Sequence, residues 1–356
     1  MRPSALPRRQ VLIGNARERL QELPGASVDC VITSPPYFAQ RDYAVDGQLG
    51  AQGHVDAWVK EILDVCRELA RVLKPSGSLF LNLGDGYSRH LKEGATKKSL
   101  LLGPERVALA LTDDGWLLRN KVIWAKTNPM PASVTDRLSC SYEVLYFLTR
   151  QRQYYFDLNA IRVPALSMPH PGRTLRAQHY PPREAVPHVG RVPRIDLNHG
   201  LAALKAAGRE SHPLGRNPGD VWPMATGAYR GSHFATFPIE LVRRPLLATC
   251  PEHVCTACGM PWKRTMQRQH GRLLATGPLR PVCSCHSDGN AVSQPGVVLD
   301  PFLGAGTVAV AAEQYERDWI GIELNPDYAA LAEDRLADHR TARARGETTS
   351  KKDKEN

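Results

Sequence analysis

Short, mainly apolar runs alternate along the chain with longer segments in which apolar residues recur every three or four positions. Residues 28–32 and 78–83 are runs of strand length. Between them, residues 54–73 have the spacing of an amphipathic helix, which Lys74-Pro75-Ser76-Gly77 is expected to end. Alternation of this kind predicts a mainly parallel sheet with helices on both faces.

The same pattern continues over most of the chain. A strand and a short helix are predicted before residue 28, and another helix is predicted near residues 104–111. Further strands are predicted at residues 117–124, 142–148, 153–156, 297–300 and 319–322, with a helix between the last two. With 356 residues, of which 42% are hydrophobic, the chain can form one large α/β domain with insertions, or two domains.

Residues 161–216 break this pattern, because prolines, glycines and histidines interrupt every periodic run. The segment has nine lysine and arginine residues against three acidic ones, so its net charge of +6 is over half of the chain's +10. It is either a solvated linker or an insertion that contacts DNA, and we favour the insertion. Residues 339–356 are charged and poor in apolar residues, which predicts a disordered tail.

The overall charge narrows the choice of partner. A net charge of +10 and a pI of about 9.3 favour a polyanion. No apolar run reaches the length of a transmembrane helix, and no hydrophobic signal segment follows Met1. We therefore expect no membrane association and a cytoplasmic location, close to the nucleoid.

Residues 297–323 predict a βαβ unit of the kind that binds nucleotides. A buried strand ends at Asp300, a turn with Gly304 and Gly306 follows, and the second strand ends in Glu323. The glycines let the backbone approach a ligand, and Glu323 is placed to accept both hydroxyls of a ribose. The turn lacks the third glycine of a dinucleotide site and the Gly-Lys-Ser/Thr of a phosphate loop. S-adenosylmethionine fits best, because it has a ribose, no pyrophosphate, and a cationic group or amine that suits Asp300.

A second loop follows the strand at residues 28–32, in the segment Thr33-Ser34-Pro35-Pro36-Tyr37. Two prolines lack the N–H that a strand needs, so the chain must leave the sheet as a stiff loop. This 34–37 loop presents a hydroxyl, carbonyls and a ring at a strand's carboxyl end, where open α/β sheets bind ligands. It suits a planar, amine-bearing base; the alternative is a proline-rich turn closed by a packed tyrosine. Asn82 and Asp85, after the next strand, either cap that strand or bind a ligand.

Together these two motifs resemble those of the amino-group DNA methyltransferases, which methylate N4 of cytosine or N6 of adenine. Residues 300–307 resemble the family's cofactor motif, and residues 33–37 resemble its catalytic motif. The catalytic motif comes first, as in the family's beta group, and the resemblance spans about residues 10–336. It implies a Rossmann-like, seven-stranded methyltransferase sheet with a permuted order of motifs.

The resemblance also implies which residues form the site. Those implied for catalysis are Ser34, Pro35, Pro36 and Tyr37. Those implied for binding S-adenosylmethionine are Asn15, His233, Phe234, Ala235, Thr236, Asp300, Pro301, Phe302, Gly304, Gly306, Thr307, Glu323 and Asn325. Asn15 stands where the family often has an aspartate.

The implied reaction is direct methyl transfer to the exocyclic amine of a base that has left the duplex. The amine would hydrogen-bond to Ser34 Oγ and to the Pro35 carbonyl, while Tyr37 would stack on the base. No strong base heads the motif, so the proton is expected to leave late, to water. The serine favours N4 of cytosine, with N6 of adenine as the alternative. An RNA substrate and a catalytically inactive DNA-binding regulator are the remaining alternatives.

Five of the eight cysteines lie between residues 250 and 285. Four of them form two close pairs, which is how four thiolates hold structural zinc: Cys255, Cys258, Cys283 and Cys285. His286 is an alternative ligand to Cys285, and a reduced, metal-free cluster is the alternative to zinc.

The expected organisation follows from these motifs. The catalytic half spans residues 10–160, a basic target-recognition insertion 161–216, the cofactor-binding half 217–252 and 295–338, a zinc-binding insertion 253–294, and the tail 339–356. The expected partners are double-stranded DNA and, in a restriction–modification system, a cognate restriction endonuclease. The sequence leaves open whether the protein is a monomer or a homodimer.

Overall fold

The computed structural model describes residues 6–40, 45, 47–164, 212, 214–227, 237–269, 272–285 and 292–346. The chain divides into two units. The first comprises residues 1–161, 219–265 and 277–356, and the second comprises residues 162–218 and 266–276. In the described part of the second unit, Val163 and Arg216 form an isolated antiparallel bridge. Most of the expected basic insertion lies outside the described residues.

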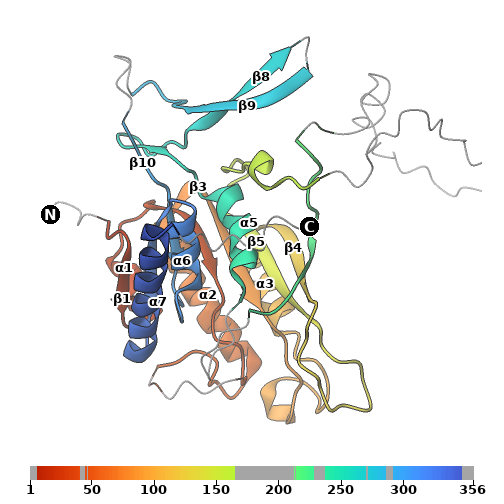
Figure 1. The fold of residues 1–356 in the computed structure, drawn as a ribbon. Helices are drawn as coiled ribbons and strands as arrows, with labels where there is room; N and C mark the ends of the chain where they lie inside the picture. Colours follow the sequence, from red (N-terminus) through yellow and green to blue (C-terminus); the bar gives the residue numbers. More distant parts are fainter. Residues whose placement is uncertain are drawn as a thin grey trace, which may run out of the picture. The chain divides into compact units, whose positions relative to one another are not determined.

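An eight-stranded sheet forms the centre of the first unit (Figure 1). Its order is β1 (Gln10–Ile13), β12 (Asp318–Glu323), β11 (Val297–Asp300), β2 (Val28–Thr33), β3 (Leu73–Leu83), β5 (Tyr142–Thr149), β4 (Leu117–Lys126) and β6 (Val221–Met224). Neighbours from β1 to β3 are parallel, as are β4 and β6, whereas β5 is antiparallel to β3 and β4. The expected mainly parallel sheet is confirmed, with eight strands among the described residues where we expected seven.

Among the described residues, three helices cover each face of this sheet. Helices α1 (Ala16–Glu22), α2 (Val55–Val72) and α3 (Gly103–Asp113) bury their apolar sides in one core. Helices α5 (Ile239–Thr249), α6 (Thr307–Gln314) and α7 (Pro326–Ala344) belong to the core on the other face. The three-layer α/β architecture expected from the sequence is therefore present. No helix among the described residues is long and apolar enough to cross a membrane.

Helix α2 shows how the apolar spacing becomes structure. Its residues Trp58, Ile62 and Leu69 are at most 1% exposed, and the His54 side chain caps its start by accepting from the Asp56 backbone N–H. The helix ends at Val72, just before Lys74-Pro75-Ser76-Gly77, as expected, but β3 begins at Leu73 and not at residue 78. The pairing of β2 with β3 shifts register between Val28 and Cys30, so residues 74–77 form an irregularity inside the strand.

Three other expectations need correction. Residues 153–156 are not a strand; Tyr154 and Phe156 instead pack around Phe147 of β5. Strand β6 was not foreseen, because Pro223 lies within it, and a proline is tolerated there because β6 is an edge strand. Helix α7 continues to Ala344, past residue 339 where we expected a disordered tail to begin. Residues 347–356 lie outside the described residues.

The cysteine-rich insertion contains short strands of its own. Strand β7 (Val254–Cys255) pairs antiparallel with β10 (Ser293–Gln294), and β8 (Lys263–Gln269) pairs with β9 (Arg272–Arg280) in a separate two-stranded sheet. The short 3₁₀ helices η1 (Leu91–Glu93) and η2 (Leu158–Ile161) complete the described elements.

Candidate functional site

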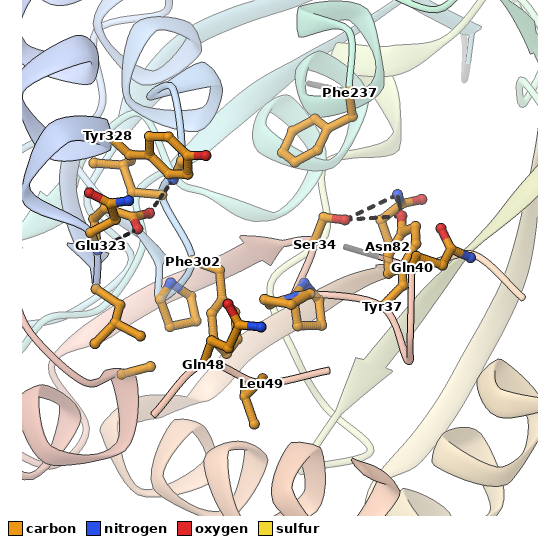
Figure 2. Close-up of a pocket in the computed structure, with 18 of the residues that line it drawn as sticks. Ser34, Tyr37, Gln40, Gln48, Leu49, Asn82, Phe237, Phe302, Glu323 and Tyr328 are labelled. Carbon is orange, nitrogen blue, oxygen red and sulfur yellow. Dashed lines mark hydrogen bonds between the residues drawn. The ribbon is translucent and has the colours of Figure 1, made fainter. Parts of the chain in front are cut away.

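A cavity of about 790 Å³ opens at the carboxyl edge of the parallel strands, which is where open α/β sheets bind ligands. Several strands deliver side chains to it. The 34–37 loop follows β2, the glycine-rich turn (residues 301–307) follows β11, and Glu323 ends β12. Figure 2 shows Glu323 and Tyr328 on one side of this cavity, Ser34, Tyr37 and Asn82 on the other, and Phe302 between them in this view. The two motifs found in the sequence therefore face one cavity.

Hydrogen bonds fix the 34–37 loop in place. Ser34 Oγ lies 3.1 Å from the Tyr37 hydroxyl, and the Pro36 carbonyl accepts from Trp58 Nε1 at 2.9 Å. The Tyr37 ring lies against Gly84, where an added Cβ would come within 2.8 Å of Tyr37 Cε2. The loop is therefore held by hydrogen bonds as well as by its two prolines, and its tyrosine has contacts through its hydroxyl and through its ring.

Three polar side chains that the sequence analysis did not join to the loop surround it. Asn82 Nδ2 donates to the Tyr37 hydroxyl at 2.7 Å and to Glu143 Oε2 at 2.8 Å. The Tyr37 hydroxyl donates to the same Glu143 oxygen at 2.6 Å, and Lys126 Nζ lies 2.6 Å from Glu143 Oε1. All three side chains line the cavity. The loop's hydroxyls are thus connected to a carboxylate that is paired with a lysine.

The positions of these three residues follow from the sheet. Asn82 is near the carboxyl end of β3, and Lys126 ends β4. Strand β5 runs antiparallel, so Glu143 near its start lies at the same edge. Asn82 was considered as a cap or a ligand contact, whereas Lys126 and Glu143 were missed. Asp85 was expected to cap the strand end or to bind a ligand; its carboxylate instead accepts from the Leu102 and Gly103 backbone N–H groups at the start of α3.

Glu323 forms the other side of the cavity. Its Oε2 accepts from the Gly304 backbone N–H at 2.7 Å, and its Oε1 accepts from that of Asn325 at 2.9 Å. Burial raises the pKa of Glu323, while these two N–H donors lower it. Each carboxylate oxygen still has a lone pair for a ligand hydroxyl. The carboxylate is therefore fixed by backbone and remains able to accept from a ribose.

The glycine-rich turn needs both of its glycines for different reasons. Gly304 has φ +51°, and an added Cβ there would meet no atom within 4 Å, which leaves the backbone open toward the cavity. Gly306 has φ +76° and precedes α6, where an added Cβ would lie 3.0 Å from Ala332 Cβ. Gly304 thus gives access to a ligand, whereas Gly306 lets α6 pack against α7.

Asp300 is 1% exposed and is not among the residues that line the cavity. Its Oδ1 accepts from Thr33 Oγ1 at 2.7 Å and from the Phe302 backbone N–H at 3.0 Å. Burial raises the pKa of Asp300 to about 7, against the opposing effect of these hydrogen bonds. In this structure Asp300 ties the strand before the 34–37 loop to the glycine-rich turn.

Most of the residues predicted from the sequence meet at this cavity. Those that line it are Asn15, Ser34, Pro35, Pro36, Tyr37, Pro301, Phe302, Gly304, Thr307, Glu323 and Asn325. Asp300 and Gly306 are not among the residues that line the cavity. His233, Phe234, Ala235 and Thr236 lie outside the described residues, although Phe237, next in the chain, does line the cavity.

A second cluster is formed by the four cysteines predicted to bind zinc. The Sγ atoms of Cys255, Cys258, Cys283 and Cys285 all lie within 4.8 Å of one another. The pKa of the Cys255 thiol is lowered to about 6, chiefly by a hydrogen bond from the Cys258 backbone N–H. Gly259 follows with φ +71°, the left-handed conformation of a tight turn. Four thiolates from two turns are a donor set that fits tetrahedral zinc; His286 lies outside the described residues.

Comparison with known proteins adds independent findings. Residues 28–334 match the model of a family described as DNA methylase. The Type II methyltransferase M.SmaI of Serratia marcescens is 30% identical over 349 residues, covering 92% of this chain and 90% of that protein. The Type II methyltransferase M.Cfr9I of Citrobacter freundii is 31% identical, covering 91% of this chain and 86% of that protein. Among solved structures, the PvuII DNA methyltransferase (cytosine-N4-specific) has a TM-score of 0.51 at 18% identity, covering 96% of this chain and 94% of that one.

Proposed function

The chain belongs to the DNA methylase family, and from this we propose that it transfers the methyl group of S-adenosylmethionine to the exocyclic N4 of cytosine in duplex DNA. The observation that carries the proposal is that the 34–37 loop and Glu323 line one cavity. A donor bound at Glu323 and a base bound at Ser34 would share that space. The base must leave the duplex to enter it, at a cost of roughly a few kcal/mol.

The residues on the Glu323 side suit S-adenosylmethionine, which supplies an electrophilic methyl group. The remaining lone pairs of Glu323 would accept the ribose hydroxyls. The open backbone at Gly304 permits close approach, and Phe302 and Tyr328 offer apolar surface within the same lining. A volume of about 790 Å³ is large enough for a ligand of this size together with a planar base.

The residues on the Ser34 side suit an amine. An exocyclic nitrogen is a poor nucleophile, because its lone pair is conjugated with the ring. Hydrogen bonds from the amine to Ser34 Oγ and to the Pro35 carbonyl would draw the nitrogen toward tetrahedral geometry and localise that pair. The rigid loop holds both acceptors in fixed positions, which contributes through proximity and orientation.

Cytosine is preferred over adenine because a serine, and not an aspartate, heads the loop. The fold is also that of a protein described as cytosine-N4-specific. N6-adenine methylation remains the alternative, since the same loop can accept from either amine. The names of the relatives, which are Type II methyltransferases, support the further proposal that a restriction endonuclease accompanies this enzyme.

Incubation with duplex DNA and labelled donor, followed by nucleoside mass spectrometry, tests this function. The expected product is N4-methylcytosine, and the Ser34→Ala variant should lose it. N6-methyladenine as the sole product would replace cytosine by adenine. Incorporation into RNA alone would overturn DNA as the substrate, and no incorporation into either would favour a DNA-binding regulator.

We also propose that the four-cysteine cluster holds Zn²⁺ as a structural ion. With four protein thiolates, the ion would have no open position for a substrate or water. Its part would be to join the turn at residues 255–259 to that at residues 283–285, and so to fix the two ends of the β8–β9 hairpin.

A further inference from the structure

Ser34, Tyr37 and Glu143 form a chain of hydrogen bonds that leads from the reacting end of the cavity to a carboxylate. The distances are 3.1 Å from Ser34 Oγ to the Tyr37 hydroxyl and 2.6 Å from that hydroxyl to Glu143 Oε2. Tyr37, Ser34 and Glu143 all line the cavity. The significance of this chain rests on the proposed function, because it concerns the proton that leaves the methylated amine.

The chain has only one possible direction. A carboxylate can only accept, so the single proton of the Tyr37 hydroxyl points to Glu143. The proton of Ser34 must then point to Tyr37, because the tyrosine has no second proton to donate. Ser34 Oγ accepts from Asn82 Nδ2 at 3.4 Å, which leaves its other lone pair for the amine of a bound base. Each member is oriented to accept from the side of the base and to donate toward Glu143.

Neighbouring side chains stabilise this direction. Asn82 Nδ2 lies within hydrogen-bond distance of the Tyr37 hydroxyl, Glu143 Oε2 and Ser34 Oγ, so it contacts all three members of the chain. Lys126 lies 2.6 Å from the other oxygen, Glu143 Oε1. The Glu143 side chain is 15% exposed and that of Lys126 is 22% exposed, so their charges are shielded from most of the solvent. The lysine therefore stabilises a charged carboxylate without occupying the oxygen that Tyr37 uses.

We infer that Glu143 receives the proton of the reacting amine through the hydroxyls of Ser34 and Tyr37. In the step, a bond forms between the exocyclic nitrogen and the methyl carbon, and the bond from that carbon to sulfur breaks. The electron pair of the broken bond stays on sulfur, and the nitrogen becomes positively charged. One N–H proton passes to Ser34 Oγ, the serine proton to Tyr37, and the tyrosine proton to Glu143. This replaces the expectation that the proton goes to water.

The competing explanation is that Glu143 and Lys126 only anchor the tyrosine ring. The two explanations differ in what two isosteric variants would do. Glu143→Gln keeps an amide that can bond to Tyr37 but cannot take a proton at neutral pH. Tyr37→Phe keeps the ring against Gly84 but interrupts the chain. If Glu143 only anchors the tyrosine ring, Glu143→Gln should keep the rate of methyl transfer. If Glu143 accepts the proton, that rate should fall.

The test is the single-turnover rate of methyl transfer to duplex DNA over a range of pH, with donor and DNA saturating. The titratable groups that hydrogen-bond to Glu143 are Tyr37 and Lys126. For Glu143→Gln we expect about a 100-fold lower rate, at the low end of what a positioned proton acceptor contributes. The variant should also lose the acidic limb of the wild-type pH profile, while its affinity for S-adenosylmethionine is unchanged. In Glu143→Ala, added formate should restore part of the rate.

The matched control is Glu105→Gln. Glu105 pairs with Lys121, also on β4, at 2.6 Å but outside the cavity lining, so this variant should keep the wild-type rate and profile. A wild-type rate and pH profile in Glu143→Gln would overturn the inference while leaving the proposed function intact. Absence of methyl transfer by the wild-type protein would instead overturn the proposed function, and this inference with it.

Discussion

The hydroxyl of Thr33 donates a hydrogen bond of 2.7 Å to Oδ1 of Asp300 across the paired strands β2 and β11. Thr33 is the last residue before the 34–37 loop, and Asp300 is the last before the glycine-rich turn. Both side chains are about 1% exposed. In addition to the pairing of the two strands, this buried contact thus joins the loop proposed to hold the base to the turn proposed to hold the methyl donor.

Thr33→Val should destabilise the protein, because it leaves the buried Asp300 oxygen without its side-chain donor. The expected loss of unfolding free energy is about 1–3 kcal/mol, measured by denaturant unfolding at neutral pH. Thr33→Ser, which keeps the hydroxyl, is the control and should lose less. Equal stability of the valine variant and the wild type would show that the contact contributes nothing.

Asp300 predicts a pH dependence of stability whose sign can be worked out. Burial raises its pKa from 3.8 to about 7, so the folded protein keeps a proton that the unfolded chain releases between these values. The unfolding free energy should therefore fall as pH rises through that window, with the loss complete above about pH 7. Between pH 4 and 8, the unfolding free energy of Asp300→Asn should fall by up to about 4 kcal/mol less than that of the wild type. The exposed Asp334 provides the control, Asp334→Asn; identical slopes in both variants would contradict the prediction.

Gly84→Ala should lower methyl transfer without weakening donor binding. Its new Cβ would lie 2.8 Å from Tyr37 Cε2 and displace the ring. We expect a fall of at least about 10-fold in single-turnover rate, since small displacements of positioned groups are costly. Gly86→Ala makes the same chemical change, but its Cβ would lie 3.8 Å from its nearest neighbour outside the adjacent residues, Leu101 Cδ1. Equal rates in the two variants would show that the position of Tyr37 is not critical.

Features that are contiguous in the chain could be predicted from sequence. The strand, glycine-rich turn, helix α6 and Glu323 all lie within residues 297–323, so local pattern alone indicated a nucleoside site. The proline-stiffened 34–37 loop was equally local. Both motifs could be placed at one edge of the sheet because parallel strands share their carboxyl ends.

Features that depend on pairing between distant strands could not be predicted in the same way. Glu143 reaches the cavity only because β5 runs antiparallel, which brings the start of a strand to the edge where the others end. Lys74-Pro75-Ser76-Gly77 ends the helix as its composition predicts, yet β3 already begins at Leu73, and Lys74 Nζ bonds to Asp29 Oδ1 at 2.6 Å where the pairing of β2 with β3 shifts register. In both cases tertiary contacts override the local pattern.

Glu323→Gln should weaken binding of S-adenosylmethionine. The two oxygens of the carboxylate accept from the Gly304 and Asn325 backbone N–H groups. In glutamine, an NH₂ group would replace one of these oxygens and face a backbone N–H that it cannot accept from. We expect affinity to fall about 10- to 100-fold, the cost of losing a hydrogen bond to a charged group. Isothermal titration measures it, with the exposed Glu333→Gln on α7 as control. Unchanged affinity would remove Glu323 from the proposed donor site.

The four-cysteine cluster predicts one zinc ion per chain, which a metal assay of purified protein should detect. Cys258→Ser should lose that ion, because a serine hydroxyl is a far weaker zinc ligand than a thiolate. Without the ion, the turns at residues 255–259 and 283–285 are no longer joined, so a protease should cut faster between residues 260 and 282. A strong chelator should have the same effect on the wild type, and added zinc should reverse it. Cys140→Ser is the control, since Cys140 is exposed and outside the cluster. Full zinc content in Cys258→Ser, or metal-free wild-type protein with the same cleavage rate after zinc is added, would refute the site.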